Sequence, residues 1–426
     1  MRSVFWLGVL AWAGLLALSS RPAVAAKVAA PAPDSLVAIA LSRAPALAAL
    51  RARVDEAHEL ERPAGALPNP MVELMMQDID FPRWTVGEED MSMIGPQITQ
   101  GIPFPGKRGA RRQVAIAEVR VREQDLELLR RVVARDIRSL YARLYAADRE
   151  QQSLAYGHEL LGVMAATVRD RYSAGVAEGE PMLKAQLVQA RVAERIDDLA
   201  AERSGLVAAM NRLLDAPGDA SIGEVTLLPV PLVPPMPWQD VALQGSVEVA
   251  KRRAEVQAAE RKLRAAGLER WPDFVAGAGI GFRGEKDPAV TLRLGLDLPL
   301  WSGQNQTPMV RAAAQNLQAT RESLRDAESA ARAEATRLEA DWTNAQHQVA
   351  RYAEAIVPHS SLALDAARSG YLVGRTDFST VVEDFDLWLK ARTGQAAREA
   401  ARYVTWAELQ LLIAPPVPTD AKRSGR

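Results

Sequence analysis

The sequence predicts an α+β membrane protein in which a barrel of long α-helical hairpins continues into a transmembrane β-barrel formed by oligomerisation of the chain. Three observations lead to this fold class. Two segments alternate apolar and other residues with the period of a β-strand, and proline-free segments carry apolar residues at helical spacing. The same order of elements occurs twice along the 426 residues, which indicates an internal duplication.

The first 25 residues have the composition of an export signal. Arg2 precedes an apolar run from Val4 to Leu18, and the small residues of Ala23-Val24-Ala25 suit a signal peptidase. We therefore expect residues 1–25 to be a signal peptide. The chain has no Cys, so we expect neither disulfides nor a lipid anchor on an N-terminal Cys.

The overall charge argues against a nucleic acid partner. The chain has 52 Lys and Arg residues against 53 Asp and Glu residues, and the sequence contains no concentrated basic run. Aromatic residues make up 5% of the chain, whereas Ala and Arg are abundant, a bias typical of long helices.

Short helices and a weak hairpin open the mature chain. We expect one helix that ends near Ser42 and another from Pro45 to about Arg62, before Leu67–Pro70 breaks the helical pattern. The hairpin spans about residues 70–102, and its alternating apolar positions are Val72, Leu74 and Met76, then Ile94, Ile98 and Ile102. Pro96 suits a strand edge or a bulge better than a central strand.

A long helical hairpin follows. From Gly106 to about Arg171 there is no proline, which predicts one helix or two nearly collinear helices on the order of 100 Å long at ~1.5 Å per residue. Gly175 suits a left-handed C-terminal cap, and a second helix runs from near Pro181 to about Leu214.

The second half repeats this order. We expect a helix from about Gln239 to Arg270, a hairpin over about residues 273–298, and long helices that turn near Gly374 and end near Leu412. The expected divisions are therefore a first repeat at 26–214, a proline-rich linker at 215–238, a second repeat at 239–414 and a disordered tail at 415–426.

The second hairpin is the clearest strand signal. Apolar residues alternate from Phe274 to Phe282 and again from Val290 to Leu298, nine residues in each arm, with a charged turn at Arg283–Pro288 between them. Nine residues approach the roughly 9–11 that a tilted strand needs to cross a bilayer. A hairpin on the core of a soluble sandwich is the alternative for this segment alone.

Paired landmarks support the duplication. Four pairs lie 196 to 204 residues apart: Pro68 with Pro272, Pro103 with Pro299, Tyr172 with Tyr371, and Gly175 with Gly374. Each half supplies two membrane-length strands, whereas closed membrane barrels start at about eight. Several copies must therefore close one barrel, because backbone groups in lipid need partners. The expected product is a conduit.

This order resembles the TolC-type outer membrane factors, the outer membrane efflux protein family. The residues that carry the resemblance are Pro68-Asn69-Pro70, Ile102-Pro103-Phe104-Pro105-Gly106-Lys107-Arg108, Tyr172 with Gly175, Pro272-Asp273, Pro299, and Tyr371 with Gly374. The resemblance implies a homotrimer in outer membrane lipid of a Gram-negative bacterium, with twelve strands above a helical tunnel through the periplasm. It also implies a channel rather than an enzyme, docked to a periplasmic adaptor and an inner-membrane pump of the RND type.

The resemblance leaves the cargo open. The stretch Phe104–Lys107 is similar to heavy-metal members of the family, and five of the eleven methionines, whose thioethers suit Cu(I), fall in the first hairpin region: Met71, Met75, Met76, Met91 and Met93. Apolar lipid-facing side chains are the other interpretation of these methionines. Drug efflux and type I protein secretion are the alternative functions. A periplasmic adaptor or structural coiled-coil protein is the alternative of another class, but it would not explain four strands in two copies.

A gate at the helix tips is implied by the same resemblance. Tyr371 matches a tip tyrosine that helps hold the closed state, and Glu383 matches one of two acidic positions around the narrow end, the other being Thr380 here. The family's tip arginine and aspartate correspond to Thr376 and Pro181, so the familiar latch is largely absent. The candidate tip residues are Tyr172, Gly175, Tyr371, Gly374, Thr380, Glu383 and Asp384. The alternative is that these carboxylates only stabilise the positive end of a helix.

The alternation of residues along the predicted strands indicates which side chains face the lumen of a barrel, and few sequence features indicate catalysis. The lumen candidates are Glu73, Gln77, Arg293 and Asp297, while Trp271 and Trp301 suit either an interfacial belt or core packing. Gly277–Gly281 has glycines like those of a nucleotide-binding loop but lies inside an alternating strand. The four His residues lack metal-ligand spacing, so we expect no catalytic residues, metal site or cofactor.

Overall fold

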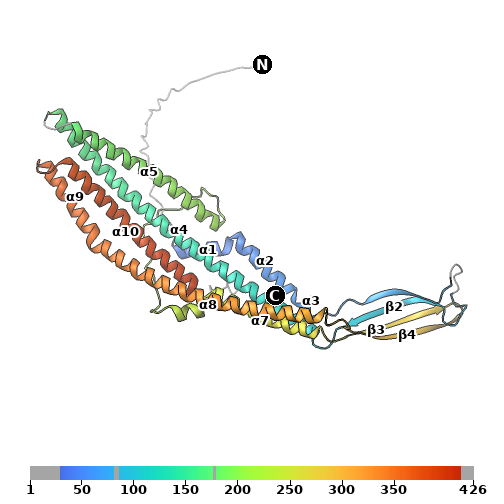
Figure 1. Ribbon diagram of the computed structural model, residues 1–426. Coiled ribbons are helices and arrows are strands. Elements are labelled where there is room, and N and C mark those ends of the chain that lie inside the picture. Colours follow the sequence, from blue (N-terminus) through green and yellow to red (C-terminus); the bar gives the residue numbers. More distant parts are fainter. Residues whose placement is uncertain (1–28, 81–85, 176–178, 414–426) are drawn as a thin grey trace, which may run out of the picture.

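The computed structural model describes residues 29–80, 86–175 and 179–413. The molecule is elongated, with a rod of helices that leads at one end into a single β-sheet (Figure 1). The predicted signal peptide (1–25) and C-terminal tail (415–426) lie outside the described residues.

The sheet contains four antiparallel strands in the order in which they occur in the sequence. They are β1 (Met71–Gln77), β2 (Met93–Ile102), β3 (Asp273–Arg283) and β4 (Lys286–Asp297). Both predicted hairpins are confirmed. Because β2 pairs with β3, the two halves of the chain form one continuous sheet whose edges are β1 and β4.

Two details of the sheet correct the prediction. The turn between β3 and β4 is Gly284-Glu285 rather than the six residues Arg283–Pro288, because Arg283 pairs with Lys286 and Gly284 takes a φ of +63°. Pro96 lies in the central strand β2 opposite Leu74, not at an edge. The strand accommodates it because the pairing of β2 with β3 is interrupted between Ile94 and Gln97, where no amide hydrogen is needed.

The helices of the first half are α1 (Pro33–Arg43), α2 (Pro45–Glu59), α3 (Glu61–Ala64), α4 (Lys107–Ser173) and α5 (Gly179–Leu214). Those of the second half are α6 (Gln239–Gly245), α7 (Val247–Leu268), α8 (Gln306–Arg351), η1 (Tyr352–Ile356), α9 (Val357–Leu372) and α10 (Phe378–Ile413). The 67-residue α4 confirms the predicted long helix as one unbroken element.

Two predicted helices are interrupted. The expected helix from Gln239 to Arg270 breaks at Ser246, whose hydroxyl accepts a hydrogen bond from the Val249 amide and so caps α7. The expected helix before Gly374 contains the π-helical turn η1 just ahead of Pro358, whose ring cannot fit the regular α-helical ladder.

The long helices pack side by side in the order α5, α4, α10 and α9 toward the free end of the rod, with α8 continuing α9 toward the sheet (Figure 1). Three apolar clusters hold them together. The largest joins α1, α2, α4, α5 and α10 midway along the rod, a second lies near the tips, and a third surrounds Trp238 between α6, α8 and α10.

Among the described residues, no individual helix combines the length and the apolar composition of a membrane-spanning helix. The helical segments Pro33–Arg43 and Pro45–Ala64, which meet at an angle of 49°, have that length and composition only when taken together.

Candidate functional site

The sheet has an apolar face and a polar face. Residues opposite one another in the register share a face, which places the even-numbered strand positions on one side and the odd-numbered ones on the other. The even-numbered positions of the ranges 72–76, 94–102, 274–282 and 290–296 form the apolar face, and Gln100 is the one polar residue among them. Its aliphatic side chains are strongly exposed, up to 88% for Leu294, although a soluble sheet would cover them.

The polar face carries all four predicted lumen residues, Glu73, Gln77, Arg293 and Asp297, because they have the same parity. Of the methionines considered as Cu(I) ligands, Met71, Met75 and Met93 also lie on the polar face, whereas Met76 lies on the apolar face. The interpretation of these methionines as lipid-facing is therefore unsupported for three of the four that lie in strands.

Glycines of β3 make room on the polar face for side chains of β2. Gln97, which is 3% exposed, lies opposite Gly279, and its amide donates a hydrogen bond to the Thr99 hydroxyl at 3.3 Å. Thr99 lies opposite Gly277, and a Cβ there would meet the Thr99 hydroxyl at 3.2 Å. Gln97 and Thr99 were not among the predicted site residues, because their facing glycines are known only from the register.

Lys107 joins the sheet to the helices. The ammonium group is 3% exposed and lies 2.8 Å from an Asp273 carboxylate oxygen and 3.4 Å from one of Glu269. It also donates to the Trp271 carbonyl at 2.8 Å, and the Phe104 amide donates to Asp273 at 2.7 Å. These contacts connect the end of β2 with the start of β3.

An aromatic stack covers this junction. The rings of Phe104 and Trp271 lie 5.1 Å apart with 12° between their planes. Trp271 and Trp301 remain exposed, so neither is a core residue. No local sequence signal marks this role of Lys107, because its acidic partners lie more than 160 residues away.

The helical hairpins end together at the far end of the rod (Figure 1). The first turns at Gly175, with a φ of +72°, and the second at Gly374, with a φ of +75°. Both angles lie in the left-handed region that favours glycine, as predicted for Gly175.

The two candidate tip tyrosines lie in different environments. Tyr371 is 7% exposed, and its ring packs edge-on against Phe378 with 5.6 Å between the centroids. Both belong to the cluster that includes Val168 of α4 and Ala185 of α5. Tyr172 is exposed at the end of α4. Tyr371 therefore helps pack its own hairpin against the first one.

The acidic candidates lie at the start of α10. Thr380 and Glu383 are exposed and three residues apart, so they share one face of the helix, and Asp384 is half-buried beside them. Neither carboxylate forms a salt bridge with a described residue. Their negative charge remains available to a cation at the tip.

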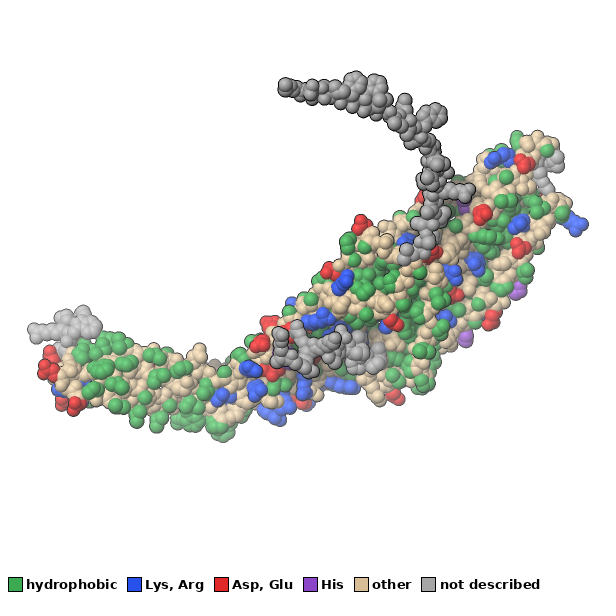
Figure 2. Space-filling model, turned by 180° about the vertical axis from the view of Figure 1, so that it is seen from behind, with side chains coloured by type: hydrophobic (Ala, Val, Ile, Leu, Met, Phe, Trp, Pro, Cys, Tyr) green, Lys and Arg blue, Asp and Glu red, His purple; other side chains and the backbone are tan. Residues whose placement is uncertain are grey.

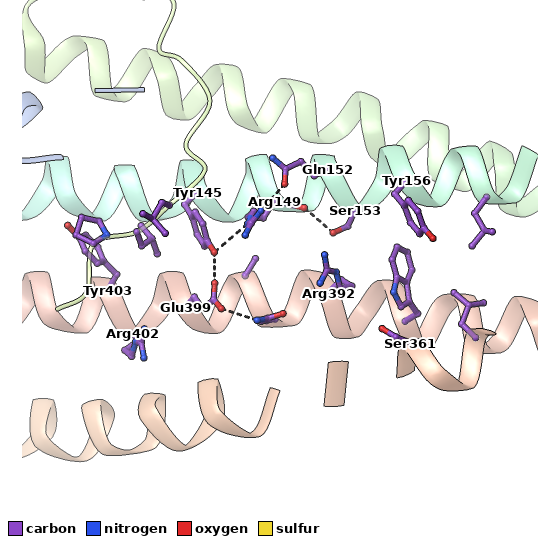
Figure 3. A pocket seen from close by; sticks show the side chains of 18 of the residues that line it. Tyr145, Arg149, Gln152, Ser153, Tyr156, Ser361, Arg392, Glu399, Arg402 and Tyr403 are labelled. Atoms are coloured by element: carbon purple, nitrogen blue, oxygen red, sulfur yellow. Dashed lines mark hydrogen bonds between the residues drawn. The ribbon is translucent and has the colours of Figure 1, made fainter. Parts of the chain in front are cut away.

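A cavity of about 640 Å³ lies between α4, α9 and α10, under the linker. Figure 3 shows the Tyr145 hydroxyl, which donates a hydrogen bond to the Glu399 carboxylate, and Arg149, whose guanidinium lies 5.6 Å from the Tyr145 ring centre. Burial raises the pKa of the Tyr145 hydroxyl. Because these groups pair with one another, they hold α4 and α10 together.

Comparison with known proteins identifies this architecture. The family model described as outer membrane efflux protein matches residues 36–218. The resemblance to the outer membrane efflux protein family that the sequence predicts is confirmed over these residues. The members of this family are outer membrane channels rather than enzymes, and they form trimers that work with adaptors and inner-membrane pumps.

Solved channels share the fold across nearly the whole chain. The outer membrane protein VceC of Vibrio cholerae is 17% identical, with 89% of this chain and 95% of that chain covered and a TM-score of 0.75. A membrane protein from Pseudomonas aeruginosa is 12% identical, with 91% of each chain covered and a TM-score of 0.78. The open-state MtrE channel of Neisseria gonorrhoeae is 14% identical, with 90% and 89% covered and a TM-score of 0.69. The predicted fold class is confirmed. Comparison with curated proteins finds no match.

Proposed function

We propose that this efflux-family chain is the outer membrane exit duct of a tripartite efflux system, a passive conduit that carries substrate from a pump to the outside. The observation that supports this most directly is the sheet. One face is apolar and exposed, and the outer edges of β1 and β4 pair with no strand in the described part of the chain. An apolar face suits lipid, but open edges do not, because backbone groups in lipid require partners.

Three copies would remove the open edges. If β4 of one copy pairs with β1 of the next, the twelve strands close a barrel above the minimum of about eight. The helical rods then form a tunnel through the periplasm, with the tips toward an adaptor and an RND-type inner-membrane pump. The division into two repeats, 26–214 and 239–414, joined by a linker at 215–238, is part of this proposal.

Residue roles follow from the same arrangement. Glu73, Gln77, Arg293 and Asp297 line the barrel lumen, since the opposite face is the one suited to lipid. At the other end, the hairpin turns at Gly175 and Gly374 and the residues Tyr172, Tyr371, Thr380, Glu383 and Asp384 form the periplasmic opening. The threefold symmetry would bring three copies of each carboxylate around one axis.

Membrane fractionation and electrical recording test this proposal. The protein should be recovered from the outer membrane as a heat-resistant trimer without a lipid anchor, and the purified trimer should form conducting pores in planar bilayers. Recovery as a soluble periplasmic monomer would rule the proposal out.

We further propose metal cations as the cargo. The support is the register, which places the thioethers of Met71, Met75 and Met93 on the same face as the Glu73 carboxylate. Deletion of the gene should then sensitise the host to Cu(I) or Ag(I). A deletion strain that becomes sensitive only to drugs, or that fails to secrete a protein, would identify the alternative cargo.

A further inference from the structure

Five exposed arginines gather where the sheet meets the helices. They come from the first two turns of α4, from the end of α7 and the turn after it, and from the first two turns of α8: Arg108, Arg112, Arg264, Arg270 and Arg311. We call this group the basic belt. Figure 2 shows Lys and Arg side chains concentrated just beyond the apolar sheet. Two of the five lie in the basic stretch Lys107–Arg112, and the fold brings the other three to it from two other segments.

The belt retains its charge. At the same level, Lys107 and Arg111 are paired with Glu269 and Asp273 at 2.8 to 3.4 Å. None of the five belt arginines forms a salt bridge with a described residue, and Arg108 donates only to the Gly65 carbonyl. Glu269 and Asp273 are therefore already paired with other cations, and the belt presents positive charge to its surroundings.

Exposed apolar side chains lie between the belt and the sheet. Trp271 directly follows Arg270, and Leu300 and Trp301 protrude from the connection between β4 and α8, Leu300 being 74% exposed. Tryptophan with an apolar body and a polar N–H is the residue that favours the boundary between acyl chains and headgroups. The apolar face, the tryptophans and the belt thus follow one another along the molecule in the order of a membrane's core, boundary and charged surface.

We propose that the basic belt binds the headgroups of anionic phospholipids in the leaflet that faces the helical rod. The proposal rests on the outer membrane placement proposed above. Arginine suits this partner, since its guanidinium forms charge-assisted, often bidentate hydrogen bonds with phosphate oxygens. Basic clusters immediately outside a membrane-spanning segment attract anionic lipid in the same way.

A four-residue variant tests the belt, with Arg108, Arg112, Arg270 and Arg311 replaced by Gln. The matched control replaces Arg169, Arg191, Arg368 and Arg398 by Gln, four exposed arginines on the other half of the rod that likewise form no salt bridge with a described residue. Full-length trimers are purified from micelles that contain equal phosphatidylglycerol and phosphatidylcholine. Mass spectrometry then measures the ratio of the two lipids retained.

Wild type and control should retain phosphatidylglycerol over phosphatidylcholine by about fivefold or more, and the belt variant should lose that excess. Replacing the same four arginines by Lys should preserve most of it, because charge is retained. Equal retention of both lipids by wild type, or an undiminished excess in a belt variant that still forms heat-resistant trimers, would overturn the proposal.

Conductance of the same preparations separates the two proposals. Conducting trimers without lipid selectivity would refute the belt alone. Selective trimers that never conduct would refute the exit duct and support the belt.

Discussion

At the scale of single residues, Lys107 links the start of α4 to the start of β3 at the sheet end of the rod. Its buried ammonium group holds Asp273, Glu269 and the Trp271 carbonyl together within 3.4 Å. Removing one member of such a group leaves the others with unsatisfied hydrogen-bonding capacity.

Lys107→Met should therefore destabilise the protein by about 1–3 kcal/mol and reduce the yield of heat-resistant trimer. The control is Lys184→Met, which removes an exposed ion pair with Glu180 and should change stability by less than about 1 kcal/mol. Thermal dissociation of the trimer on gels measures both. Equal effects of the two substitutions would show that burial of Lys107 is unimportant.

A second residue-scale prediction concerns the close approach of β2 and β3. A Cβ added at Gly95 would lie 1.7 Å from the Ile280 carbonyl oxygen, whereas one at Gly101, in the same strand, would meet nothing within 4 Å. Gly95→Ala should cost about 1–3 kcal/mol and impair barrel assembly. Gly101→Ala should stay within about 0.5 kcal/mol of wild type. The measurement is trimer yield in the outer membrane fraction, and similar yields would contradict the register.

These residues mark a limit of sequence-based inference. The alternation in β3 and β4 was visible because a strand's faces depend only on local spacing, and the lumen candidates followed from it. The surroundings of Lys107, Gln97 and Gly95 depend on contacts between segments some 160 or more residues apart. Local pattern cannot specify which pairs meet.

At the scale of elements, β4 is the strand whose two faces differ most. Leu292 and Leu294 are exposed on the apolar face, and Thr291 and Arg293 lie on the polar face.

Breaks in helices are a second feature at the scale of elements. Ser246 and Pro358 carry recognisable signals for a helix start, but the long periodic patterns around them favoured continuous helices.

Leu294→Arg should impair insertion by about 2–4 kcal/mol if the residue lies near the middle of the membrane, because the charge would face lipid. Thr291→Arg adds the same side chain on the polar face and should be tolerated. Folding into nanodiscs, followed by trimer quantification, compares them. Matching defects would mean that the assignment of faces is wrong.

At the scale of the whole molecule, the proposed exit duct makes the helix tips the opening through which substrate would enter. Three copies of Glu383 and Asp384 around one axis would concentrate negative charge, which attracts cations. Glu383→Ala with Asp384→Ala should therefore lower cation selectivity and block by multivalent cations in single-channel recordings. Glu322→Ala with Asp326→Ala, on the shaft of α8, is the control. Wild-type selectivity in the tip variant would leave these carboxylates as stabilisers of the α10 N-terminus.

The tip tyrosine gives a further whole-molecule prediction. Tyr371→Phe keeps the ring packed on Phe378 but removes the hydroxyl. Conductance should rise if the hydroxyl helps hold the opening narrow. Tyr172→Phe, on the exposed tyrosine of the first hairpin, is the comparison. Unchanged conductance in Tyr371→Phe would restrict this residue to packing.

The pairing of β2 with β3 also has a consequence in time. β2 ends at Ile102 and its partner begins at Asp273, so 170 residues must still emerge after the first hairpin is made. At the usual 5–20 residues per second of synthesis, this delay is on the order of 10–30 s. An isolated two-stranded hairpin is marginally stable in water, and this one exposes an apolar face that invites aggregation. We therefore expect the first hairpin of the nascent chain to need shielding by a chaperone until the second arrives.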